Sequence, residues 1–147
     1  MLRRFFVFLA LLVVAVGAAA CASQSSPAQT DTTAFQKNAA GYVDITVDQL
    51  AKMLENKDFV LVNVHIPYEG EIPNTDLFIP FNEIANNLDK LPDKNARIVL
   101  YCRSGRMSTI AAETLVSLGY TNVFEVDGGF NAWQASGRPL EFNQPSS

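Results

Sequence analysis

The chain has 147 residues, of which 48% are hydrophobic and 18% charged, a balance typical of one globular domain and not of a disordered chain. Fifteen acidic and 11 basic residues give a formal net charge of -4, and no basic stripe favours binding to nucleic acid. One histidine and two distant cysteines are too few for a structural zinc site of the usual kind. We therefore expect a single domain without metal or cofactor and without a nucleic-acid partner.

The first 20 residues have the features of a secretory signal peptide. Arg3 and Arg4 precede an uncharged apolar run that extends to Gly17, and three alanines then lead to Cys21. This order resembles a bacterial lipobox, in which the signal is cut just before a cysteine that carries lipid. The position three residues before the cysteine holds Ala18 instead of the usual leucine.

We therefore expect residues 1–20 to be removed and Cys21 to be lipidated. The lipid would anchor the protein to a membrane of the cell envelope, facing the periplasm or the exterior. Two alternatives stay open: an uncleaved spanning helix over residues 5–22, and plain secretion if Cys21 carries no lipid. Removal of the signal takes away two of the 11 basic residues and leaves nine against 15 acidic ones, a charge of -6. Residues 21–40 hold too few apolar side chains to offset the entropy of an ordered chain, so they are predicted to form a flexible tether.

The globular domain is predicted over residues 41–142, followed by a tail at 143–147. Strand patterns occur at 42–45, 59–64, 77–79, 97–101 and 123–126, and helix patterns at 47–55, 81–88, 107–118 and 130–135. The strands 59–64 and 97–101 are nearly continuous apolar runs, which is typical of strands covered on both faces. Their alternation with helices predicts an α/β domain with a mainly parallel sheet.

Local signals support two of the helices. Thr46 and Gln49 are spaced as a capping box at the start of the helix over 47–55. Gly119 is expected to end the helix over 107–118 in a left-handed conformation. The buried side of that second helix is predicted from helical spacing to consist of Ile110, Ala111, Thr114, Leu115 and Leu118.

The segment 101–108 reads YCRSGRMS and places the thiol of Cys102 directly after a buried strand and before a helix. Amide groups of a first helical turn converge at such a position, so an anionic thiolate is favoured there. Arg103 and Arg106 add positive charge, and Gly105 allows the loop to curl so that several amides point to one centre. Cys102 is therefore a candidate nucleophile. The alternative is a small buried residue that ends a strand.

The same segment resembles the active-site loop of the rhodanese sulfurtransferases. Residues 61–84 are similar to the first signature region of that family, and residues 118–140, with a Gly-Gly turn and an Ala-Trp pair, to its closing one. The resemblance covers residues 42–140 and implies a single rhodanese-like domain, in which helices flank a mainly parallel five-stranded sheet.

The resemblance also implies an activity. Cys102 would take a sulfane sulfur from a donor such as thiosulfate, become a persulfide, and pass the sulfur to cyanide or a thiol. The partners would be that small donor and acceptor, with a protein donor or acceptor as a further option. The loop that would hold the persulfide consists of Arg103, Ser104, Gly105, Arg106, Met107 and Ser108.

Four positions depart from the family pattern. Asn63 and His65 stand where the first signature usually has aspartate and arginine, and Glu71 stands where its common Gly-His-Ile has histidine. Met107 stands where a basic residue often follows the cysteine by five positions. His65, the only histidine, is a candidate accessory residue of the site, with a packing or hydrogen-bonding role as the alternative. These changes bear on the preferred sulfur donor more than on the chemistry of the cysteine.

Three other functions are alternatives to sulfur transfer. A cysteine phosphatase needs an arginine six residues after its nucleophile, where this chain has Ser108. A sulfur carrier or protein-binding module without turnover would need the same thiolate as an enzyme. A redox protein of the thioredoxin kind would need a second cysteine within reach, and only Cys21 without lipid could serve.

Overall fold

The computed structural model describes residues 35–143. The predicted signal peptide, the lipidation site at Cys21 and the predicted tether as far as residue 34 lie outside the described residues, as do residues 144–147. No helix within the described range combines the length and the apolar character that crossing a membrane requires.

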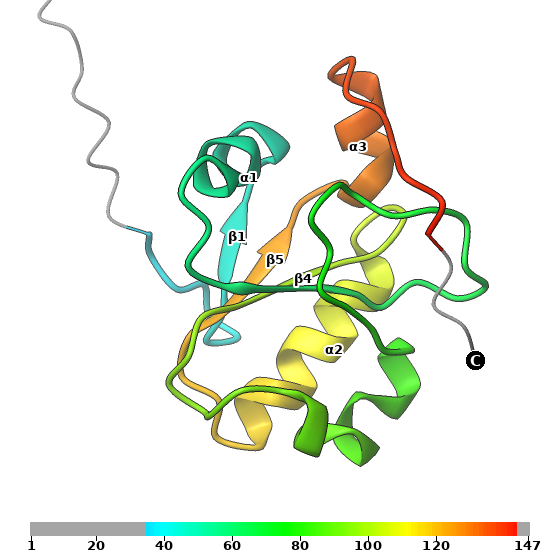
Figure 1. Cartoon of the computed structure of the whole chain (residues 1–147). Helices are drawn as coiled ribbons and strands as arrows, with labels where there is room; N and C mark the ends of the chain where they lie inside the picture. Colours follow the sequence, from blue (N-terminus) through cyan, green and yellow to red (C-terminus); the bar gives the residue numbers. More distant parts are fainter. Residues whose placement is uncertain (1–34, 144–147) are drawn as a thin grey trace, which may run out of the picture. The chain divides into compact units, whose positions relative to one another are not determined.

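Five strands form one parallel sheet in the order β1-β5-β4-β2-β3. Figure 1 labels the first three of this order, β1, β5 and β4. The strands are β1 Val43–Ile45, β2 Val60–Asn63, β3 Leu77–Phe78, β4 Ile98–Tyr101 and β5 Val123–Val126. Each begins and ends within one residue of its predicted limits. The predicted α/β class with a five-stranded parallel sheet is therefore confirmed.

The helices cover both faces of this sheet, as buried strands require. They are α1 Val47–Leu54, α2 Arg106–Ser117 and α3 Gly129–Ala135. Helices α1 and α3 lie on one face, and α2 lies on the other (Figure 1).

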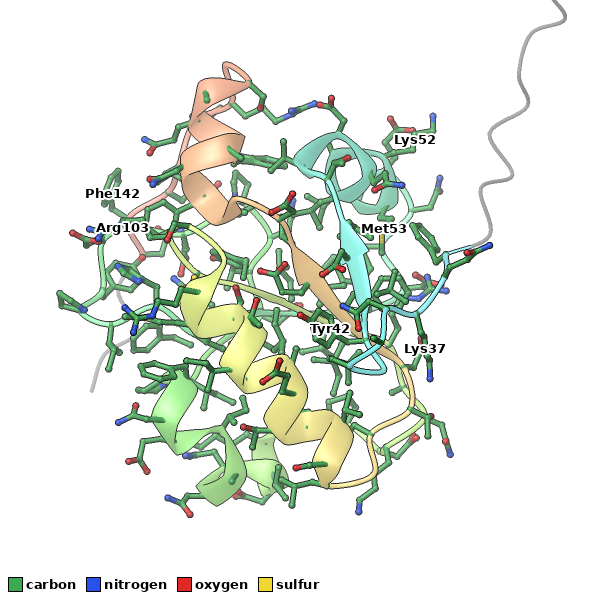
Figure 2. The ribbon with its side chains drawn as sticks, turned by 180° about the vertical axis from the view of Figure 1, so that it is seen from behind. Lys37, Tyr42, Lys52, Met53, Arg103 and Phe142 are labelled. Atoms are coloured by element: carbon green, nitrogen blue, oxygen red, sulfur yellow. The ribbon has the colours of Figure 1, made fainter. Side chains whose placement is uncertain are left out.

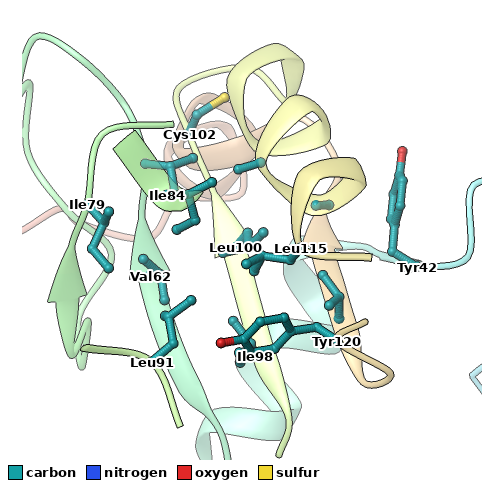
Figure 3. Packing of buried hydrophobic residues seen from close by; sticks show 14 residues of the cluster. Tyr42, Val62, Ile79, Ile84, Leu91, Ile98, Leu100, Cys102, Leu115 and Tyr120 are labelled. Carbon is teal, nitrogen blue, oxygen red and sulfur yellow. The ribbon is translucent and has the colours of Figure 1, made fainter. Parts of the chain in front are cut away.

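Side chains of a strand alternate between the two faces, and this alternation decides which residues meet at the site. In β4, Val99 and Tyr101 pack in the cluster with α1 and α3, whereas Ile98 and Leu100 pack in the cluster with α2. Cys102 continues the second set and lies at the end of β4 near the start of α2 (Figure 3). The thiol therefore faces α2.

Both predicted helix signals are confirmed. The Gln49 amide N–H donates to Thr46 Oγ1 at 3.2 Å and the Thr46 amide N–H to Gln49 Oε1 at 2.8 Å, which completes the capping box of α1. Gly119 follows α2 with φ of 89°, and the amide of Tyr120 donates to the carbonyl of Leu115 at 3.0 Å. This hydrogen bond is the Schellman arrangement that a left-handed glycine permits.

The predicted α-helix over residues 81–88 is wrong. Phe81–Asn86 and Leu88–Lys90 form two short 3₁₀ helices, η1 and η2, on the α2 side of the sheet. No side chain caps η1, whose first residue follows Pro80. Neither segment gains the more favourable i→i+4 hydrogen-bond geometry that a longer capped α-helix would have.

The predicted buried side of α2 is also partly wrong. The fully buried residues of this helix are Ser108, Ala111, Ala112 and Leu115. Ile110 is 41% exposed. The small side chains of the two alanines allow α2 to approach the sheet closely, and the packed face is rotated away from Ile110 toward Ser108. This rotation directs a hydroxyl toward the end of β4.

Residues 35–40, which composition assigns to the tether, contact the domain. The ring of Phe35 packs edge-on against Phe124, with centroids 5.2 Å apart. Lys37 Nζ donates to the carbonyl of Thr121 at 2.6 Å, and Asn38 Nδ2 donates to Asp44 Oδ2 at 2.9 Å. The domain thus includes chain on the N-terminal side of the predicted limit at residue 41.

Candidate active site

The thiol of Cys102 is enclosed by its own loop. The residue is 1% exposed, and its Sγ accepts a hydrogen bond from the Gly105 amide at 3.1 Å. Ser108 Oγ lies 3.4 Å from the same sulfur. Gly105 has φ of 101°, a conformation that a residue with a side chain rarely adopts, and this curl aims its amide at the sulfur. Within residues 35–143, the Gly105 N–H is the loop amide that donates a hydrogen bond to Sγ.

Helix α3 binds the backbone of the Cys102 loop through its first amides. The amides of Phe130 and Asn131 donate to the carbonyls of Cys102 and Arg103, each at 3.0 Å. Gly129 lies so close to these carbonyls that a Cβ atom would overlap the Cys102 oxygen. The Gly-Gly turn noted in the sequence therefore allows α3 to bind the backbone of the cysteine loop.

The two loop arginines differ in their partners. Arg103 Nη1 lies 3.2 Å from Glu69 Oε2, and Figure 2 shows Arg103 at the surface. Arg106 is exposed at the start of α2 and forms no ion pair with the described part of the chain. Its guanidinium group is therefore available to an anion.

His65 lies beside the same loop, although it follows a different strand. It lines a pocket of about 200 Å³ together with Cys102, Arg103, Ser104, Arg106 and Met107. Its ring is buried, with its Nε2 atom 2.5 Å from Glu69 Oε2, and forms a T-shaped pair with the ring of Phe130. A carboxylate only accepts hydrogen bonds, so Nε2 carries a hydrogen and donates it. His65 Nδ1 is buried without a hydrogen-bond partner among the described residues.

Glu69 connects His65 to Arg103, and sequence reasoning did not identify it. The hydrogen bond from His65 and the positive charge of Arg103 hold the pKa of the Glu69 carboxyl below its usual range. The spacing of four residues between His65 and Glu69 occurs in a loop, where spacing alone indicates no contact. The ion pair with Arg103 joins residues 34 positions apart and depends on the fold.

Asn63, at the end of β2, fixes the chain segment that leads to Glu69. Its Nδ2 donates to the Gly70 carbonyl at 3.0 Å, and its Oδ1 accepts from the His65 amide at 3.0 Å. The side chain is completely buried. An amide thus supplies both a donor and an acceptor at the position where the family pattern usually has aspartate.

Glu125 is the second residue that the sequence did not reveal. It lies in the middle of β5 and is 3% exposed, and Ser108 Oγ lies 2.6 Å from its Oε1 atom. Burial is the main cause that raises the pKa of Glu125 to about 7, with the charges of Asp44 and Asp127 acting in the same direction and the Ser108 hydrogen bond opposing them. Ser108 therefore links the candidate nucleophile to a buried carboxyl group.

Within residues 35–143, no group of three or more His, Cys, Asp or Glu side chains is arranged to hold a metal ion. Cys102 is the free cysteine of this part of the chain. The polar groups gathered around the thiol are the loop amides, the two arginines, His65, Ser108 and Glu125.

Comparison with known proteins identifies the family. The family model of the rhodanese-like domain matches residues 46–136. The chain belongs to this family. A curated sulfurtransferase from Allochromatium vinosum is 34% identical over 92 residues, which cover 60% of this chain and 84% of that protein. The thiosulfate sulfurtransferase GlpE of Pseudoalteromonas translucida is 32% identical over 95 residues, which cover 63% of this chain and 89% of that protein.

The solved structures agree with this assignment. The crystal structure of a rhodanese-like domain protein from Staphylococcus aureus has a TM-score of 0.58 and 34% sequence identity to this chain. The match covers 69% of this chain and 98% of that one. The rhodanese-like fold expected from the resemblance is confirmed.

Proposed function

We propose that this rhodanese-like protein is a sulfurtransferase that moves a sulfane sulfur from a small donor such as thiosulfate to a thiol or cyanide. The observation that carries the proposal is the placement of Cys102, whose Sγ accepts a hydrogen bond from the curled Gly105 amide at the end of a parallel strand. An anionic sulfur is stabilised by such amides and by the start of α2. Relatives named sulfurtransferase and thiosulfate sulfurtransferase support the same reaction class.

The reaction proceeds in two displacement steps. The Cys102 thiolate attacks the outer sulfur of thiosulfate, so a new S–S bond forms while the bond to the sulfonate sulfur breaks, and sulfite leaves with the electron pair. Cyanide or a thiolate then attacks the outer sulfur of the persulfide, and the Cys102 thiolate is regenerated. The two steps together need no external oxidant or reductant, because the sulfur passes from one nucleophile to another.

The pocket supports a small anionic donor. Its volume of about 200 Å³ suits a compact ion, and Arg106 lines it without an ion-pair partner among the described residues. Arg103 lies on the same pocket but is already paired with Glu69. We therefore assign Arg106 the main electrostatic contact with the donor and Arg103 the orientation of the loop.

The arrangement disfavours the phosphatase alternative. The position where a phosphatase loop carries its clamping arginine is Ser108, whose hydroxyl lies 2.6 Å from the carboxyl group of Glu125. Arg106 begins α2 two residues earlier, too early for the bidentate contact of that chemistry.

Sulfur transfer is tested with thiosulfate and cyanide as substrates. Cys102→Ser should abolish thiocyanate formation, and intact-mass measurement should find one added sulfur atom on the parent after thiosulfate alone. Cys21→Ser, which changes the other cysteine, is the matched control and should retain activity. Sulfur transfer by Cys102→Ser would refute the assigned nucleophile.

The same experiment separates an enzyme from a carrier. A sulfur carrier without turnover would take up one sulfur atom and then produce no more thiocyanate than one equivalent. Repeated turnover at a constant initial rate is the result expected for the enzyme.

We also propose that the mature protein is held at the cell envelope by lipid on Cys21. The support is the order of basic residues, apolar run, small residues and cysteine at the start of the chain. Two or more acyl chains give a stable anchor, because each buried CH₂ group contributes about 0.8 kcal/mol. Cys21→Ser should move the protein from the membrane fraction to the soluble fraction. Unchanged membrane retention of this variant would instead favour an uncleaved helix.

A further inference from the structure

The hydroxyl group of Ser108 has more acceptors within reach than it has hydrogens. Its Oγ lies 2.6 Å from Glu125 Oε1, 3.0 Å from the Gly105 carbonyl and 3.4 Å from Cys102 Sγ. A serine hydroxyl has one hydrogen to donate and two lone pairs to accept with. The direction of the Ser108 hydrogen must therefore depend on which neighbours carry a charge.

The Cys102 sulfur and the Glu125 carboxyl group compete for the single hydrogen of the Ser108 hydroxyl. When Glu125 is ionised, Ser108 donates to the carboxylate, and a lone pair of Oγ is left to accept from the thiol of Cys102. When Glu125 is protonated, its own O–H donates to Ser108 Oγ, and the Ser108 hydrogen is free for a thiolate. One negative charge can thus reside at either end, with Ser108 donating to the charged group.

We propose that Glu125 is a positioning residue that takes up the proton of the Cys102 thiol through Ser108. The S–H bond of Cys102 breaks as its hydrogen moves to Ser108 Oγ, the original Ser108 O–H bond breaks, and that hydrogen ends on Glu125. The charge moves from the carboxylate to the sulfur, and no proton enters or leaves. This relay deepens the proposed sulfur transfer, because it supplies the thiolate that attacks the donor.

The surroundings of Glu125 favour an acid that keeps a proton near neutral pH. Asp44 pairs with Glu125 across the neighbouring strand β1, and Asp127 follows β5. From α2, Arg106 lines the same cleft as these three carboxyl groups, and β4 presents Cys102 at its end. Burial together with the two aspartates raises the pKa of Glu125 to about 7. The group therefore changes its charge in the pH range where the thiolate is needed.

The alternative is a structural hydrogen bond between Ser108 and Glu125 that leaves the thiol unaffected. Both roles keep the side chains in place, but only a relay couples their protonation. The rate of Cys102 alkylation by iodoacetamide reports the thiolate and requires no sulfur donor. It is followed on the full chain from pH 5 to pH 9 by mapping the tryptic peptide 98–103, which contains Cys102 and excludes Cys21. A failed relay and failed sulfur transfer therefore give separate results.

In the parent protein, alkylation should rise with pH in two steps, and the first step should lie near pH 7, where the coupled groups lose their first proton. Glu125→Gln should remove the first step, because an amide takes up no proton. Ser108→Ala should remove it as well and slow alkylation at pH 7 roughly tenfold, the effect of one lost hydrogen bond to a charged acceptor. Glu113→Gln, an exposed change on the same helix, is the control and should keep both steps.

A double variant separates the relay from a simple charge effect. On the Ser108→Ala background, Glu125→Gln should change the profile little, since the connection is already broken. A first step that persists in Glu125→Gln, or an equal effect of Glu125→Gln with and without Ser108, would overturn the relay.

A second measurement keeps Glu125 unchanged and so does not depend on the folding of its variants. The side-chain carboxyl carbon of Glu125, followed by NMR, should titrate in two steps in the parent and in one step in Cys102→Ala. Identical titrations in the two proteins would also overturn the proposal.

Discussion

The buried carboxyl group of Glu125 should make the stability of the domain depend on pH. Its pKa is raised from 4.5 to about 7 by burial, so the folded state holds a proton that the unfolded state releases. Stability from this group is fully present below about pH 4.5 and is lost as pH rises through about 7. At about 1.4 kcal/mol for each pH unit, the loss approaches about 3 kcal/mol by pH 8.

The test compares urea unfolding of the parent and of Glu125→Gln at pH 5 and at pH 8. The free energy of unfolding of the parent, minus that of the variant, should be about 2.5 kcal/mol smaller at pH 8 than at pH 5. Contributions of titrating groups that do not interact with Glu125 cancel in this difference, and Glu113→Gln controls for the loss of one carboxylate. An unchanged difference between the two pH values would mean that Glu125 ionises freely in the folded protein, which would contradict its burial.

Three further predictions concern the site and the core. Arg106→Ala should slow sulfur transfer from thiosulfate roughly ten- to a hundredfold. A rate equal to that of the parent would mean that the loop amides bind the donor anion without Arg106. Gly129→Ala should lower the free energy of unfolding by about 3 kcal/mol or more, because its Cβ would overlap loop backbone, whereas Gly137→Ala, with open space around it, should cost only about 1 kcal/mol. Leu115→Ala should cost about 2 to 5 kcal/mol and Ile110→Ala well under 1 kcal/mol, and similar losses in chemical denaturation would contradict the observed orientation of α2.

The helix ends that the sequence predicted correctly are fixed by local signals. Thr46 and Gln49 complete their capping box within one turn, and Gly119 ends its helix through its own conformation. The 3₁₀ segment was missed because Phe81 and Ile84 are three residues apart, a spacing that α and 3₁₀ helices share. Periodicity alone therefore could not separate the two kinds of helix.

The site residues also divide into those that lie close together in the sequence and those that only the fold brings together. Cys102, Gly105 and Ser108 stand within seven consecutive positions, so the sequence places them together before any fold is known. Glu69 and Glu125 reach the loop across 34 and 17 residues, respectively. Glu125 stands in a run that is otherwise typical of a buried apolar strand. Whether its side chain faces the site depends on which face of β5 lies toward α2. That face is set by the strand order of the sheet, which periodicity does not provide.

The contact between α3 and the cysteine loop connects the Gly-Gly turn of this chain to the electrostatics of Cys102. In a trans peptide the N–H points opposite to the C=O. The amides of Phe130 and Asn131 hold the carbonyls of Cys102 and Arg103 toward α3, so the N–H groups of those two peptide units point away from α3. Carbonyl oxygens, which would repel an anion, are thereby turned out of the loop. Gly129 allows this contact because it has no Cβ, and its role is therefore electrostatic as well as steric: it sets the direction of the peptide dipoles around the sulfur.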